Sequence, residues 1–118
     1  MRNYLEDPVY VQDFDNLEDV YTEFGINEIN GLPLYMEYSQ GSYEGSSNCW
    51  FDKDGQLMYN YASHCSCYGL EGQWDPETYY PVQLVKMDKY DKPSQEFIDW
   101  VKATYDEVGM RKGRLSIE

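Results

Sequence analysis

Asn48-Cys-Trp-Phe-Asp-Lys-Asp-Gly-Gln-Leu-Met-Tyr-Asn-Tyr61 carries the strongest structural signal in this chain of 118 residues. Two runs rich in apolar and aromatic residues, 48–51 and 57–61, flank a polar segment with Asp54-Gly55 at its tip. Asp-Gly readily adopts the positive φ angles of a two-residue turn, so this pattern predicts a β-hairpin. The rest of the fold is expected to assemble around that antiparallel pair.

Further strands are predicted on both sides of the hairpin. Residues 32–39 alternate with a period of two, placing Leu32, Leu34, Met36 and Tyr38 on one side and Tyr35 and Glu37 on the other. Residues 79–87 are rich in Tyr and Val and also predict a strand. Pro81 favours an edge position for it, because proline cannot donate to a sheet ladder.

Two helices are predicted near the ends of the chain. Residues 16–24 place apolar side chains at i, i+3, i+4 and i+7, namely Leu17, Val20, Tyr21 and Phe24. Asp15 or Asn16 can cap the start of this helix, and Gly25 can end it. The second helix begins at the N-cap Ser94, ends at Gly109 and buries a stripe of Phe97, Ile98, Val101, Tyr105 and Val108.

These elements predict one acidic α+β domain over residues 1–118. Its expected architecture is an antiparallel sheet of about four strands, with a short N-terminal helix and a longer C-terminal helix on one face. The first dozen residues and the last eight are expected to be loosely held termini.

The charge balance excludes several classes of function. There are 22 Asp and Glu against nine Lys and Arg, for a net charge of −13. A strongly acidic surface repels nucleic acid and anionic lipid, so neither is an expected direct partner.

The sequence also shows no membrane segment, because no apolar run is long enough to span a membrane. The segment at 1–10 lacks the apolar core of a secretion signal, so a cytoplasmic location is expected.

The negative charge is concentrated in the first half of the chain. Residues 1–54 hold 12 acidic residues against Arg2 and Lys53. The acidic side chains of helix 16–24 project away from its apolar stripe, which predicts a surface that can occupy a Lys- and Arg-lined groove built for nucleic acid. The expected contacts are Asp13, Asp15, Glu18, Asp19, Glu23 and Glu28, with Tyr21 or Tyr35 as aromatic anchors.

The three cysteines offer an alternative. An odd number of cysteines without a secretion signal indicates free thiols in a reducing compartment. Cys65 and Cys67 would share one face of an extended strand, and they could bind zinc together with Cys49 and His64. Small buried cysteines would explain the same residues without a metal. The sequence therefore leaves open a metal-stabilised interaction module, whereas the acidic hypothesis requires no cofactor.

The segments His64-Cys-Ser-Cys67-Tyr68 and Gly72-Gln-Trp74-Asp75-Pro76 resemble small bacteriophage proteins. The acidic, Tyr-rich composition is similar to that of phage anti-defence proteins that mimic nucleic acid, including anti-CRISPR and anti-restriction proteins. The resemblance implies a viral protein that acts in the host cytoplasm as a non-enzymatic inhibitor of a defence nuclease complex. It carries over no functional residue. A basic, nucleic-acid-binding protein is the partner it implies.

Overall fold

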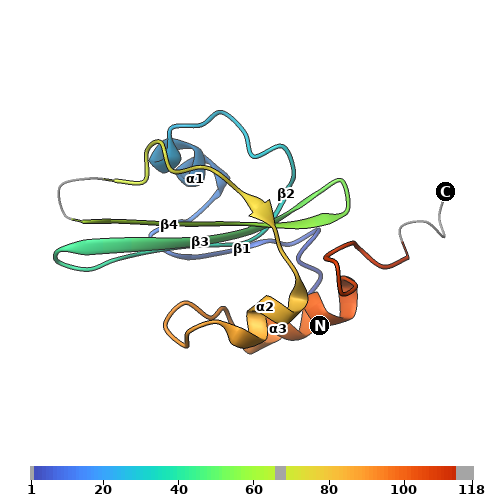
Figure 1. Ribbon diagram of the computed structural model, residues 1–118. Helices are drawn as coiled ribbons and strands as arrows, with labels where there is room; N and C mark the ends of the chain where they lie inside the picture. The colour runs from blue at the N-terminus through green and yellow to red at the C-terminus, as the bar shows by residue number, and fades with distance from the viewer. Residues whose placement is uncertain (1, 66–68, 114–118) are drawn as a thin grey trace.

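The computed structural model describes residues 2–65 and 69–113. Its elements follow in the order β1 (Val9–Gln12), α1 (Leu17–Phe24), β2 (Leu32–Gln40), β3 (Glu44–Lys53), β4 (Gln56–Cys65), β5 (Glu77–Thr78), α2 (Pro81–Lys86) and α3 (Gln95–Thr104). The α+β class predicted from the sequence is confirmed. Figure 1 shows the long strands β2, β3 and β4 running through the middle of the molecule, between two layers.

The central hairpin is confirmed. β3 and β4 pair in antiparallel register from Glu44 opposite Cys65 to Lys53 opposite Gln56. The turn residues Asp54 and Gly55 have φ angles of 52° and 92°, the positive values that a type I′ turn requires.

The sheet has five strands in the order β1-β2-β3-β4-β5, and it is mixed. The prediction of about four antiparallel strands is therefore wrong at the edges. β1 runs parallel to β2, with Val9 opposite Tyr35. Together with the buried ring of Tyr4, this strand ties down the first dozen residues, contrary to the loose terminus that the sequence predicts. Four residues are too few to show a strand period clearly.

The helices lie on both faces of the sheet, contrary to the prediction that they share one face (Figure 1). On the α1 face, Val20 and Phe24 pack against Met36, Phe51 and other residues of the sheet. On the α2/α3 face, Phe97 and Val101 pack with Tyr35, Trp50 and other aromatic residues. The physical reason lies in Cys49, Trp50 and Phe51, three consecutive buried residues. Successive side chains of a strand point to opposite faces, so such a run requires cover on both.

Helix α1 matches its prediction closely. The Asn16 side chain caps its first turn by accepting the Asp19 N–H, and Gly25 ends it in the left-handed conformation at φ 69°. The two apolar side chains of α1 that are fully buried, Val20 and Phe24, belong to the predicted stripe.

The strand predicted over residues 79–87 is wrong. This segment forms α2, with Pro81 in its first turn. Proline suits that position, because its missing N–H has no partner at a helix start and its φ is already helical. Just before this segment, Glu77 and Thr78 pair with β4 as the short strand β5.

Helix α3 starts as predicted, with the Ser94 hydroxyl accepting the Phe97 N–H, but it ends at Thr104 rather than near Gly109. Beyond it, the Asp106 carboxylate accepts the N–H groups of Val108 and Met110 at 3.0 Å each. Such local bonds offer the backbone an alternative to the helix. Val108 is consequently exposed, whereas Tyr105 remains buried as predicted. Of the final eight residues, the structure describes 111–113, and Arg111 is held in an ion pair with Asp52.

Candidate functional site

The α1 face of the molecule is covered by two segments without a single basic side chain. Residues 13–30 and 69–75 together carry eight carboxylates and no Lys, Arg or His. We call these carboxylates the acidic face; they are Asp13, Asp15, Glu18, Asp19, Glu23, Glu28, Glu71 and Asp75. All are exposed except Asp19, which is half-buried. In Figure 1 the second segment runs alongside α1 above the sheet.

Glu71 and Asp75 were not among the predicted contacts. They follow α1 by about fifty residues, and the fold brings them to it: the Gly72 N–H donates to the Phe24 carbonyl at 3.4 Å. Trp74 anchors this segment by packing edge-on against Phe24 and stacking on Phe51. The acidic turn-rich stretch at 71–77 was the only sequence signal, and it gave no indication of which face it covers.

Two of the predicted contacts have a structural task as well. The Asp19 carboxylate accepts the Asp15 N–H at 2.8 Å, while the Asp19 N–H donates to Asn16 at 3.0 Å. Asp19 therefore binds both residues that precede α1, Asp15 through its carboxylate and Asn16 through its backbone N–H, and these two bonds fix the start of the helix. Asp13 accepts from the Gln40 amide at 3.2 Å. The side chains of Glu18, Glu23 and Glu28 have no hydrogen-bond or ion-pair partner in the described part of the chain, so they are among the members free to engage another molecule.

A buried tyrosine reports the electrostatic influence of this face. Burial raises the pKa of Tyr38, and the nearby carboxylates of Glu23 and Asp13 raise it further. The Tyr38 hydroxyl forms a 2.6 Å hydrogen bond with His64 Nε2. Residues from β1–α1, from β2 and from the end of β4 therefore meet below the acidic face.

The two predicted aromatic anchors lie in different places. Tyr21 is half-buried on the α1 face, where it packs against the core cluster of Phe24 and Met36. Tyr35 points to the opposite face, where it is 7% exposed and stacks on Phe97 with ring centroids 4.9 Å apart. Tyr35 is therefore not part of the acidic surface.

The carboxylates of the acidic face are not neutralised by ion pairs. Across residues 2–65 and 69–113, the two ion pairs are Arg2 with Asp7 and Arg111 with Asp52, and neither involves the acidic face. Residues 86–118 hold seven acidic and seven basic residues. Residues 1–85 therefore carry all of the net charge, and the described residues 86–113, which include α3, hold six acidic and six basic residues.

Among the described residues, Cys49 is not brought together with His64 and Cys65 as a metal site. Cys49 is buried between the β-sheet and α1, and burial raises the pKa of its thiol to about 12, which opposes the thiolate form that binds metals. It lies opposite Asn60, five residues along β4 from the exposed Cys65, or about 16 Å at the rise of a strand. Cys67 lies outside the described residues. Within these, no group of three or more His, Cys, Asp or Glu side chains could hold a metal ion.

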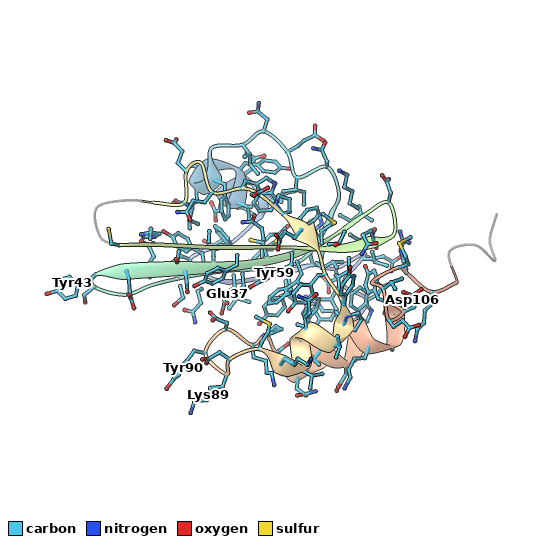
Figure 2. The ribbon with its side chains drawn as sticks, viewed as in Figure 1. Glu37, Tyr43, Tyr59, Lys89, Tyr90 and Asp106 are labelled. Atoms are coloured by element: carbon cyan, nitrogen blue, oxygen red, sulfur yellow. The ribbon has the colours of Figure 1, made fainter. Side chains whose placement is uncertain are left out.

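A polar network that sequence reasoning missed lies on the other face of the sheet. The buried amide of Asn48 donates to Glu37 at 3.2 Å and to Asp91 at 3.4 Å, and it accepts a hydrogen bond from the Tyr59 hydroxyl. Burial raises the pKa of Glu37, as does the neighbouring Asp91. Figure 2 shows Glu37 and Tyr59 below the sheet, facing the loop that carries Lys89 and Tyr90. Asp91 joins from that loop, a contact over 43 residues that no local pattern indicates.

Comparison with known protein families, with curated proteins and with solved structures finds no significant match to this chain. Among the helices of the described residues, none combines the length and the apolar character needed to cross a membrane.

Proposed function

We propose that the chain is a non-enzymatic inhibitor whose acidic face occupies a basic, nucleic-acid-binding surface of a host defence nuclease complex, as anti-CRISPR and anti-restriction proteins do. One observation carries the proposal. Eight carboxylates gather on the α1 face without a Lys, an Arg or an ion pair among the described residues that form it. Solubility alone does not require a protein to segregate its charge in this way.

The geometry of α1 suits a partner surface that binds phosphates. Glu23 lies four residues from Asp19, a separation of about 6 Å along the helix axis. Phosphates of one nucleic-acid strand advance about 3.4 Å each along the duplex axis while winding around it. Arg and Lys side chains that bind phosphates also bind carboxylates, because both are anionic oxygen acceptors.

A charge-reversal experiment tests the proposal. Asp19 is unsuitable for it, because its carboxylate holds the Asp15 N–H just before α1, so the variant is Glu23→Lys with Glu28→Lys. Glu23 lies in the last turn of α1, which contains no basic residue. Lysine there complements the helix dipole, so the fold should be unharmed. The matched control is Glu77→Lys with Glu107→Lys, which changes the net charge equally at exposed positions off the acidic face.

Wild type, variant and control are immobilised and used to capture proteins from a bacterial host lysate at low and high salt. Wild type and control should retain the same basic nucleic-acid-binding protein at low salt and lose part of it at high salt, because salt screens the attraction. The Glu23/Glu28 variant should retain none. Equal retention by all three proteins would contradict the proposal.

A further inference from the structure

The α2/α3 face of the sheet changes character halfway along its strands. Near the helices it carries Tyr35, Trp50 and Leu57, which are buried in the aromatic core. Beyond Asn48 the same face carries Ser39, Ser46 and Ser63, and on this side of the sheet Figure 1 shows α2 and α3 beneath the other end only. Three strands thus present small hydroxyl side chains where they could have continued the apolar core.

The three serines form one row across the sheet. Ser39 is the direct neighbour of Ser46 on β3, and Ser46 is the direct neighbour of Ser63 on β4. The Cβ atoms of residues paired in this way lie about 4.5–5.5 Å apart. Within the part of the chain that the structure describes, none of these three hydroxyls has a hydrogen-bond partner. Each therefore remains able to donate one hydrogen bond and to accept others.

This row forms the floor of a depression of about 650 Å³. Tyr61, Glu44 and Cys65 add to its lining, and no Lys or Arg is among the described residues that form it. Tyr61 is half exposed, so part of its ring is accessible to solvent. On the side nearer the helices, Asn48 is fixed between Tyr59, Glu37 and Asp91. A depression of this size accepts a small ligand. Because Asn48 beside it is already held in place, fewer side chains need to be ordered when a ligand binds.

We propose that this depression is a binding site for a neutral saccharide, and we call it the serine depression. A sugar ring presents hydroxyls at its rim, which match a row of hydroxyls that both donate and accept. The faces of the sugar carry C–H groups, whose partial positive charge suits the negative face of an aromatic ring such as that of Tyr61. Phosphate-bearing or sulfated ligands are disfavoured, because the described lining offers the Glu44 carboxylate and no Lys or Arg, and both ring nitrogens of the lining residue His64 are already hydrogen-bonded. Apolar ligands would leave the hydroxyls without partners.

The serine row and the acidic face lie on opposite faces of the sheet, and Gln40, which also lines the depression, connects them by donating to Asp13. NMR titration of the ¹⁵N-labelled full chain tests the proposed site with three probes: maltotetraose, which is neutral, a glucosamine tetramer, which is cationic, and tetragalacturonate, which is anionic. Maltotetraose should shift the amide signals of Ser46, Tyr61 and Ser63 with a Kd of about 1 mM or lower. Tetragalacturonate should not shift them.

Two variants with a matched control locate the contact. Tyr61→Ala should weaken maltotetraose binding about tenfold, and Ser46→Ala should weaken it severalfold by removing one hydroxyl. Tyr80→Ala, at another exposed tyrosine outside the depression, should leave the affinity unchanged. The proposal is overturned if maltotetraose at about 10 mM, ten times the weakest expected Kd, shifts no signal from these strands. It is also overturned if only the cationic tetramer binds, or if the Tyr61 and Ser46 variants bind as wild type does.

Discussion

Replacing Asp52 by Asn should destabilise the protein strongly, because this carboxylate joins the hairpin to the C-terminal segment. The Asp52 side chain is 1% exposed. Its Oδ1 accepts from the Gly55 N–H at 2.8 Å and from Arg111 Nη2 at 3.3 Å. Its Oδ2 accepts from the Tyr105 hydroxyl at 2.6 Å and from Arg111 Nε at 3.1 Å. Asparagine keeps one acceptor oxygen but turns an amide donor toward Arg111, which cannot accept.

Breaking a buried ion pair costs about 3–5 kcal/mol. The Arg111 side chain is 30% exposed, so water compensates in part and the lower end, about 3 kcal/mol, applies. For a chain of this length that loss lowers Tm by about 12 °C. The control is Asp54→Asn at the neighbouring turn position, where Asp54 is exposed and has a positive φ that Asn also tolerates. Calorimetry of the two variants is the assay. If Asp52→Asn melts within a few degrees of Asp54→Asn, the hydrogen bonds and ion pair of Asp52 do not hold the C-terminal segment as described.

Three further stability predictions follow from buried groups. Phe97→Ala removes a fully buried ring that contacts Tyr35 and Trp50 and should cost about 3–5 kcal/mol in urea unfolding; a loss below 1 kcal/mol would show that α3 is not docked as described. Burial raises the pKa values of Cys49 and Tyr79 from 9.0 and 10.0 to about 12. With their side chains protonated, these two residues stabilise the folded state fully below about pH 9, and this stability is lost as the pH rises toward 12. In Cys49→Ala only the tyrosine contribution remains, so the loss of stability should begin one pH unit later, at about pH 10. The folded-state pKa of Glu37 is also raised, so Glu37→Gln should raise Tm at pH 7 and leave it unchanged at pH 3, where both side chains are neutral; the opposite pattern would contradict the burial of this carboxylate.

The elements that the sequence predicts correctly have local signals. Asp54-Gly55 specifies its turn by backbone conformation, and Asn16 and Gly25 mark the ends of α1 by capping. The predictions that fail depend on contacts distant in sequence. β1 is specified by its pairing with β2, and α3 ends where Tyr105 must reach Asp52 across 53 residues. Over residues 79–87, the composition favoured a strand, and the position of one proline in the first turn of a helix outweighed it.

The same distinction between local signals and contacts distant in sequence applies to the candidate site. Period and charge alone place Glu18 and Glu23 on the exposed side of α1, and the structure has them there. The sequence places Tyr35 on the side of its strand opposite Met36 and Tyr38, but it could not show which of these sides lies against α1, because both carry buried apolar side chains. Nor could it show that Glu71 joins the acidic face, because that depends on how the segment after β4 packs against α1.

Competition with nucleic acid tests the central claim most directly. The partner captured from lysate is saturated with a fluorescently labelled duplex, and the displacement of that duplex by this protein is followed by anisotropy. Wild type and the Glu77/Glu107 control should displace the duplex completely. The Glu23→Lys, Glu28→Lys variant should require at least about 100-fold more protein, because paired charges at such an interface cost about 2–5 kcal/mol or more when lost. If wild type binds the partner while the duplex stays bound, or if the variant competes as well as wild type, the acidic face does not occupy a nucleic-acid-binding surface.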